Sequence, residues 1–380
     1  MNWRYFLLVA VFSRMTLGAT DVQAGSPSLN VQQHKFGQLD DGHPVWAFQL
    51  SNRMGTQVTV LTYGGIVQKI QLPAKNGNMT DIVLGYDTVE KYVADNSYLG
   101  AIVGRFANRI ANASFRLDGH KYILDQNGGQ HNLHSGSAGV NKKLWQASSW
   151  QNDTEVGVTL KVTSPDGDGG FPGNLDITAT YSLNNDNRLL LDIRANTDKK
   201  TPVSLTSHSY FNLRGEGSVL NHAVQVLAEH FTPVTPSLIP TGELRPVAGT
   251  PFDFRLSKKL IHDIDKKNQQ LLYAHGYDHN WVINTNDKQT LNKAVEIKSE
   301  VTGIAMSVFT DLPGVQLYTG NFIARDFSGK NNRQFGPRGA ICIEPQYFPD
   351  SPNQHSFPSA ILRPEQQYHK KIAWKFSIVR

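Results

Sequence analysis

A histidine and a glutamate stand in two segments of this chain where a plain structural strand would not need them. Residues 201–213 read TPVSLTSHSYFNL, and strand alternation places their polar side chains on one predicted face. These side chains are Ser204, Thr206, His208, Tyr210 and Asn212. A solvent-exposed strand remains the alternative, but exposure does not call for a histidine and a tyrosine among small hydroxyls. The pattern therefore favours a face that lines a cleft.

Residues 340–346 read AICIEPQ, an apolar strand that ends in a carboxylate. Alternation puts Glu344 on the same face as Ala340 and Cys342. Apolar neighbours raise the pKa of a carboxyl group, which suits a general base that works near neutral pH. A glutamate at a strand end already in water is the alternative.

Three further segments carry groups that suit a sugar. Residues 276–281 (GYDHNW) place aromatic rings around Asp278 and an amide, and sugars offer C–H faces to rings and hydroxyls to polar groups. Residues 104–110 (GRFANRI) contain Arg109, whose planar fork of donors can hold hydroxyls, with Asn108 beside it. Gln316 is another candidate sugar contact. An Asx turn with core aromatics and a surface ion pair remain alternatives for the first two segments.

His131 and His134 invite a metal interpretation. A zinc site needs two further ligands and usually lies on more regular structure, whereas glycines at 128, 129 and 136 predict a loop here. A hydrogen-bonding histidine is favoured, with metal binding and a purely structural role left open. Asp166 opens a segment that begins like a calcium loop, but Phe171 occupies the required glycine position, which predicts a plain turn.

The chain has 380 residues, a net charge of +5 and 37 Lys and Arg residues, scattered as isolated doublets such as Lys370-Lys371. No aromatic and basic stripe accompanies them, so we expect a solvated basic surface and no nucleic-acid partner. The one cysteine excludes an intramolecular disulfide. No P-loop, dinucleotide fingerprint or nucleophile elbow is present in the sequence.

The first 24 residues resemble a secretory signal peptide. Arg4 is followed by a short apolar run, and small residues precede Gly25 as a cleavage site, although Arg14 interrupts the apolar stretch. An unprocessed tail is the alternative. No other segment has the length of a membrane span, so we expect a periplasmic or secreted protein without a membrane partner.

The remaining elements must position these groups, and they are mostly strands. Short β-branched or alternating runs recur between turn signals, without the long helices of an α/β fold. The runs are residues 58–61, 66–72, 156–162, 177–183, 189–193, 203–208, 223–227, 306–310, 316–319 and 340–343. Only residues 87–92 and 263–274 suggest short helices, the second with an irregular loop as alternative. We therefore predict an all-β sandwich or barrel, with residues 25–380 forming one domain.

Six segments in this order resemble the aldose 1-epimerases, the galactose mutarotases, over roughly residues 34–380. The segments are residues 104–110, 132–134, 206–213, 276–280, 313–321 and the Glu344 strand. The resemblance implies a large antiparallel β-sandwich, the β-supersandwich of this family. His131 is not a usual family position, and Pro345 replaces a commoner small polar residue, so both departures leave the local loop geometry open.

By matching position, the resemblance implies that His208 is the general acid and Glu344 the general base. It implies that Arg109, His134, Asp278 and Gln316 bind the sugar, with Asn108 assisting; Tyr210 is a further expected contact. Ring opening and reclosure at the anomeric carbon need an acid and a base, and no nucleophile, metal or redox cofactor. We expect a small free aldose as the partner and a monomer or weak dimer.

Three rival functions make different demands on the residues. A hexose-phosphate epimerase needs extra cations, for which Arg105 is the nearby candidate. A silent sugar-binding module has no need of both His208 and Glu344. A glycosidase usually works with two carboxylates, whereas these segments offer a histidine and a glutamate.

Overall fold

The computed structural model describes residues 28–283 and 291–379, so the expected signal peptide lies outside the described residues. Antiparallel strands dominate, and the two α-helices among the described residues are short: α1 (Val89–Ala94) and α2 (Gln269–Ala274). The all-β prediction is confirmed. None of the helices in the described ranges has the length and hydropathy of a bilayer crossing.

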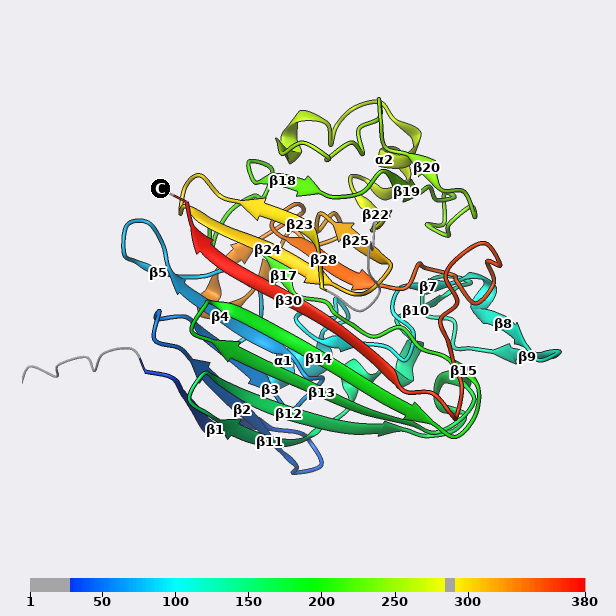
Figure 1. Ribbon diagram of the computed structural model, residues 1–380, viewed down its shortest axis with the longest axis horizontal. Helices are drawn as coiled ribbons and strands as arrows, with labels where there is room; N and C mark the ends of the chain where they lie inside the picture. Colours follow the sequence, from blue (N-terminus) through cyan, green and yellow to red (C-terminus); the bar gives the residue numbers. More distant parts are fainter. Residues whose placement is uncertain (1–27, 284–290, 380) are drawn as a thin grey trace, which may run out of the picture.

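A nine-stranded sheet forms the largest layer (Figure 1). Its order is β11 (Gln146–Gln151), β12 (Glu155–Ser164), β13 (Leu175–Asn184), β14 (Arg188–Thr197), β30 (Tyr368–Ile378), β24 (Ile304–Thr310), β23 (Asn292–Lys298), β18 (Ala223–Val226) and β21 (Lys258–Lys259). The strand nearest the C-terminus, β30, pairs with β14 on one side and β24 on the other. Figure 1 shows it in red across the middle of the sheet.

A six-stranded sheet carries the residues of interest. Its order is β17 (Tyr210–Phe211), β28 (Ile341–Gln346), β25 (Gly314–Tyr318), β22 (Asp278–Val282), β19 (His230–Thr232) and β20 (Arg245–Pro246). A five-stranded sheet runs β1 (Asn30–Gln38), β2 (Pro44–Ser51), β3 (Gln57–Leu61), β4 (Val67–Pro73) and β5 (Met79–Asp81). The remaining pairs include β6 (Ile102–Val103) with β16 (Thr206–Ser207) and β7 (Arg109–Ile110) with β10 (Asn132–Leu133).

The two larger sheets share one hydrophobic core. One face of the six-stranded sheet contributes Trp281, Leu317 and Ile343, which belong to the same buried cluster as Leu191 and Ile193 of the nine-stranded sheet. Alternation then turns four polar residues to the opposite face: Asp278 and Asn280 of β22, Gln316 of β25 and Glu344 of β28. The apolar face of the six-stranded sheet therefore packs into the shared core, and the other face carries a row of polar side chains.

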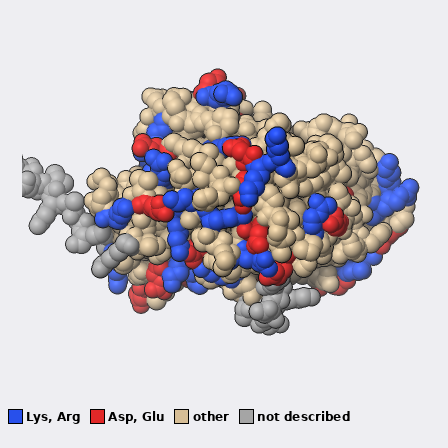
Figure 2. Space-filling view, turned by 90° about the horizontal axis from the view of Figure 1, so that it is seen from above, with Lys and Arg blue, Asp and Glu red and all other residues tan. Residues whose placement is uncertain are grey.

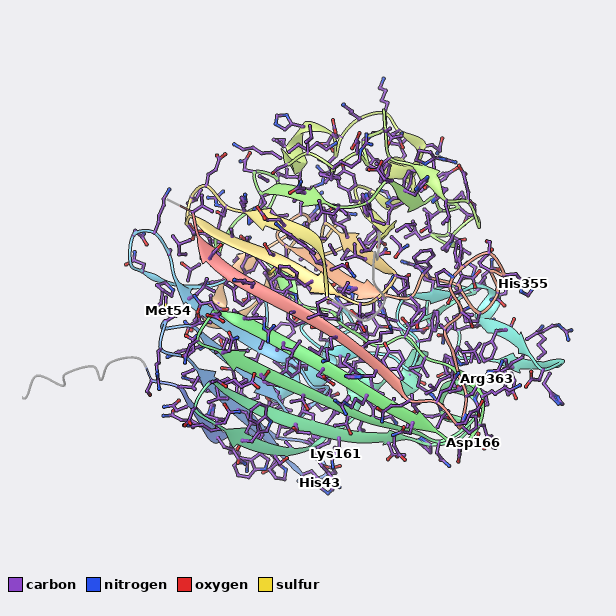
Figure 3. All side chains as sticks on the ribbon, viewed as in Figure 1. His43, Met54, Lys161, Asp166, His355 and Arg363 are labelled. Carbon is purple, nitrogen blue, oxygen red and sulfur yellow. The ribbon has the colours of Figure 1, made fainter. Side chains whose placement is uncertain are left out.

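The outer surface is of mixed charge. Figure 2 shows Lys and Arg side chains interspersed with Asp and Glu on the face seen from above, and Figure 3 places Lys161 and Asp166 at the periphery. Many of these charges are paired, as Lys199 is with Asp166 and Lys371 with Asp192. This arrangement agrees with the solvated basic surface expected from the isolated doublets.

The predicted strand over residues 203–208 is much shorter than expected. Only Thr206–Ser207 forms a strand, paired with β6, while Ser204 makes an isolated bridge to Phe106. Both predicted faces are buried, and β16 packs against β6 and β28. The expected cleft is present, but only His208 and Tyr210 of the polar set line it.

Candidate active site

A cavity of about 310 Å³ opens at the polar face of the six-stranded sheet. Its lining is Asn96, Ser97, Tyr98, Asn108, Arg109, Leu133, His134, His208, Tyr210, Asp278, Tyr318, Phe322, Ile323 and Glu344. Seven of the eight residues predicted for the site therefore meet here, although they come from segments far apart in the sequence. The eighth, Gln316, does not line the cavity.

The predicted acid and base face each other inside the cavity. His208 Nε2 lies 3.7 Å from Glu344 Oε2, and both side chains are almost fully buried. Glu344 belongs to β28, whereas His208 lies between β16 and β17. The ring of Tyr210 stacks on His208 with centroids 5.1 Å apart, while its hydroxyl donates to the carbonyl of Ser97 at 2.9 Å. Tyr210 thereby fixes the plane of the imidazole.

Burial shifts the pKa values of both members of this pair. Desolvation, reinforced by the nearby charge of Asp278, raises the pKa of Glu344 well above its usual value, and Arg109 only partly opposes it. Desolvation lowers the pKa of His208 to about 4. Burial therefore favours the neutral form of each group in the free site, a protonated Glu344 and an unprotonated His208.

A second polar pair lines the same cavity. Arg109 Nη2 lies 3.6 Å from Asp278 Oδ2, and both groups are partly shielded from water. Gln316 Nε2 donates to the other carboxylate oxygen of Asp278 at 2.6 Å. Gln316 thus lies behind Asp278 and fixes its orientation. Arg109 and Asp278 together offer donors and acceptors to neighbouring hydroxyls.

His134 has a defined tautomer. The backbone N–H of Asn108 donates to His134 Nδ1 at 3.1 Å, and the backbone N–H of His134 donates to the carbonyl of Asn108 at 3.0 Å. Both residues have positive φ angles, 67° and 50°. Desolvation, then the neighbouring His208 and Arg109, lowers the pKa of His134 well below its usual value. Neutral His134 therefore carries its proton on Nε2 and is a hydrogen-bond donor.

This tautomer bears on the metal interpretation. Potential ligand atoms of His134, His208 and Glu344 lie within 4.8 Å of one another. Because the lone pair of His134 Nδ1 already accepts from Asn108 and its other nitrogen is protonated, His134 fits a metal ligand poorly. The other histidine of the predicted metal pair, His131, is buried outside the cavity lining and accepts the N–H of Asn112 at Nδ1. The hydrogen-bonding interpretation fits both residues.

Arg105 has a structural role. Its guanidinium is buried and donates to the carbonyls of Pro172 and Gly173 at 2.9 and 2.8 Å, and also to Pro165 at 3.4 Å. The turn that begins near Asp166 is thereby tied to the body of the protein. Arg109 is the one cation in the cavity lining among the described residues. Arg105, the candidate cation for the phosphate of a phosphorylated sugar, is therefore bound to backbone carbonyls outside the cavity.

Sequence reasoning missed several residues of the cavity. Tyr98 has a positive φ and packs against both His134 and His208, with centroids 4.5 and 5.9 Å apart. Tyr318 stacks on Phe322, whose side chain is 57 % exposed at the rim. Tyr98 follows a short polar run after α1, which resembles an ordinary loop. Only the fold brings it against the two histidines.

The chain matches known proteins over most of its length. A family model described as aldose 1-epimerase matches residues 47–375. The chain is 37 % identical to a galactose mutarotase of Mus musculus, covering 92 % of this chain and 99 % of the relative. It is 36 % identical to an aldose 1-epimerase of Escherichia coli K12, covering 88 % and 96 %.

Solved structures agree as well. A galactose 1-epimerase from Lactobacillus acidophilus superimposes with a TM-score of 0.83 at 28 % identity, covering 93 % of this chain and all of the other. An aldose epimerase homologue from C. elegans gives 0.80 at 32 % identity, covering 87 % and 98 %. With the family model spanning most of its length, this chain is a carbohydrate isomerase that belongs to the aldose 1-epimerase family.

Proposed function

We propose that the protein is a mutarotase that interconverts the α and β anomers of free aldohexoses such as galactose and glucose. The observation that carries this proposal is the buried His208 and Glu344 pair, 3.7 Å apart across a cavity that also offers Arg109 and Asp278. Acid–base chemistry at one carbon needs one donor and one acceptor of protons held on the substrate. The names of the relatives support the same activity.

Ring opening uses the ion-pair form of the couple, with the charge on Glu344 and the proton on His208. Glu344 removes the proton from the C1 hydroxyl while His208 donates its proton to the ring oxygen. The C1–O5 bond breaks, and C1 becomes the carbonyl carbon of the open-chain aldehyde. Each general catalyst contributes roughly 10²–10⁴-fold to such a step.

Ring closure reverses these transfers on the other face of the carbonyl. Rotation about C1–C2 exchanges the faces, His208 accepts the proton of the C5 hydroxyl, and Glu344 returns its proton to the aldehyde oxygen. Between the two steps Glu344 is protonated and His208 is neutral. Burial favours this same state in the free protein, so the pair is matched to the open-chain intermediate.

The remaining residues bind and orient the sugar. Arg109 and Asp278 hold hydroxyls by donating and accepting, and His134 donates through Nε2. Asn108 fixes the tautomer of His134, and Tyr210 holds the plane of His208. Gln316 acts from behind by orienting Asp278. No step requires a metal or a redox cofactor.

Polarimetry tests the proposal directly. Pure α-D-galactose or α-D-glucose is dissolved, and optical rotation is followed with wild-type protein, Glu344→Gln and the control Glu300→Gln, which changes an exposed carboxylate. Wild type and the control should reach the same final rotation faster than buffer does, and Glu344→Gln should be slow. Unaccelerated rotation of several free aldoses by wild type would overturn the proposal.

We also propose that residues 1–24 are removed on export, which places the protein in a periplasm or outside the cell, and that residues 25–380 form one domain. The basic Arg4, the apolar run that follows it and the small residues before Gly25 support removal. Mass spectrometry of protein from the exported fraction should give a chain that starts near Gly25. A full-length chain retained inside the cell would contradict export.

The proposed quaternary state is a monomer or weak dimer. Light scattering after size exclusion at several protein concentrations should give the mass of one chain, rising at most toward two. A single cooperative unfolding transition in the same preparation would agree with one domain.

A further inference from the structure

The polar face that carries Glu344 continues behind the cavity. Strand register places Asn280 opposite Gln316, and Gln316 opposite Glu344. One step further along the strands, Gly314 lies opposite Gln346. The short strand β16, which contains Thr206, packs against β28. Asn280 and Gln346 thus extend the row of polar side chains, and Thr206 lies on a strand packed against β28; none of the three lines the sugar cavity.

Gly314 leaves room for the side chain of Asn280. A Cβ atom at this position would lie 2.4 Å from Asn280 Oδ1 and 2.8 Å from the ring of Phe348. The side chain of Asn280 therefore leans over Gly314 toward the strand that carries Gln346. Asn280 is 1 % exposed and Gln346 is fully buried. Any larger residue at 314 would fill the space between them.

Several side-chain atoms of these buried residues have no hydrogen-bond partner within the part of the chain that the structure describes. The unpaired atoms are Asn280 Nδ2 and Oδ1, Gln346 Nε2 and Oε1, Thr206 Oγ1, Gln316 Oε1 and Glu344 Oε2. Buried polar atoms in native proteins are almost always hydrogen-bonded to protein or to ordered water. A cluster of this size on one face is polar enough to hold internal water, which typically makes about three hydrogen bonds.

We propose that Asn280, Gln346 and Thr206 hold ordered internal water behind the acid–base pair, and that this water hydrogen-bonds Glu344 Oε2 and Gln316 Oε1. The inference rests on the proposed role of Glu344 as the base. The three residues are positioning residues, because they act on the sugar only through Glu344 and Gln316. Together with this water they form a second polar layer, which lies outside the lining of the cavity.

This layer has a chemical consequence. Hydrogen bonds donated to a carboxylate favour its charged form. Water behind Glu344 therefore offsets part of the burial that raises the pKa of its carboxyl group. The ion-pair form required for ring opening becomes more accessible, and substrate binding is hardly affected. Loss of the layer should move the acid side of the activity profile to higher pH.

Other charged and titratable groups also face Glu344 and must remain unchanged in the test. They come from the segments packed around it and are Arg109, His134, His208, Tyr210, Asp278, Tyr318 and Cys342. None of these is substituted in the variants below. A shifted profile then reports the second polar layer.

The test compares Thr206→Val and Gln346→Met with wild type, using Thr310→Val as the matched control. Thr310 is a fully buried threonine of the nine-stranded sheet, whose hydroxyl donates to the carbonyl of Lys371. Mutarotation of galactose is followed across pH, and kcat and KM are obtained separately. Both layer variants should move the acid limb up by about one pH unit, an effect of about tenfold at a fixed pH on that limb. KM should stay within about twofold, because sugar contacts are intact.

Conservative replacement keeps the result interpretable if a variant folds poorly. Thr206→Ser retains the hydroxyl and should keep the wild-type profile, as should Thr310→Val. A crystal structure of the wild-type protein at high resolution should show water within hydrogen-bond distance of Asn280 and Gln346.

Wild-type pH profiles in both Thr206→Val and Gln346→Met would overturn the proposal, as would direct pairing of the two amides without water. These outcomes are separate from the test of Glu344. An inactive Glu344→Gln with unchanged layer variants would leave the mutarotase mechanism in place and refute only the second layer.

Discussion

The nine-stranded and six-stranded sheets bury their residues in different ways. In β13, Leu175, Ile177 and Ala179 are buried, while Asp176 between them is exposed. In β28 every residue is buried, including Glu344 and Gln346. The first pattern serves the core alone, because one face is apolar and the other meets water. The second pattern buries polar groups at a cost in stability, which a protein retains where those groups do chemistry. We expect substitutions in the two sheets to affect different properties.

The largest effect on activity should come from His208, the proposed general acid, which lies beside the six-stranded sheet. His208→Asn removes the proposed proton donor and should lower kcat by about 10²–10⁴-fold. The midpoint of thermal unfolding should change little, because the replacement keeps a small polar side chain. Polarimetry and a thermal melt measure the two properties, with His369→Asn in β30 of the nine-stranded sheet as control. Near-normal rates in His208→Asn would contradict the expectation that substitutions near the six-stranded sheet affect activity and those in the nine-stranded sheet affect stability.

A core substitution in the nine-stranded sheet should show the opposite behaviour. Leu191→Ala deletes a fully buried side chain and should lower the free energy of unfolding by about 2–5 kcal/mol. The folded fraction should keep its kcat, since Leu191 belongs to the hydrophobic core and not to the cavity lining. Urea denaturation measures the first quantity and polarimetry the second. A large loss of kcat with normal stability would contradict the comparison.

Acid should destabilise the protein through a buried histidine outside the cavity. Leu213 N–H donates to His222 Nε2 at 3.0 Å, and His222 Nδ1 lies 3.1 Å from the carbonyl of Val219, so the ring must be neutral. Desolvation lowers the pKa of His222 to about 4. The unfolded chain binds the proton more readily, so stability is lost as pH falls from about 6.5 toward 4.

Between pH 7 and pH 5 this histidine should contribute a loss of about 2 kcal/mol. Urea denaturation at several pH values measures the loss, and His222→Gln should flatten the dependence in that range. Equal slopes in wild type and His222→Gln would assign the acid sensitivity to other groups.

The smallest effect should come from the outer face of the nine-stranded sheet. The hydroxyls of Thr159 and Thr180 lie 3.2 Å apart across β12 and β13, and both side chains are half-buried. Thr180→Ala should change the free energy of unfolding by less than about 0.5 kcal/mol and leave kcat unchanged. A loss above about 2 kcal/mol in denaturant titration would show that this face is more than a solvated surface.

Alternation in the sequence predicted the strands whose two faces differ, such as β12, β13 and β14. It did not identify β30, whose sequence contains the charged doublet Lys370-Lys371. In the structure Lys371 reaches Asp192 on the neighbouring strand, while the alternate residues Ile372 and Trp374 enter the core. A charged side chain on a central strand is stable when its stem packs and its charge finds a partner.

The candidate site was predicted mainly through ordered motifs. Their residue types identified His208 and Glu344, yet the position of Gln316 behind Asp278 depends on the pairing of β22 with β25. Tyr98 was missed because its segment has no periodic pattern, and its contacts with His134 arise only on folding. The second polar layer depends likewise on register, which one sequence does not specify.

The central place of β30 also sets an order for biosynthesis. Residues 368–378 leave the ribosome after every other strand of the nine-stranded sheet, yet they lie between β14 and β24. Until they emerge, those two strands present unpaired edges that invite association with other chains. The nascent polypeptide is therefore exposed to association from the completion of β14 until β30 emerges, and a chain that ends before Tyr368 is an aggregation-prone fragment.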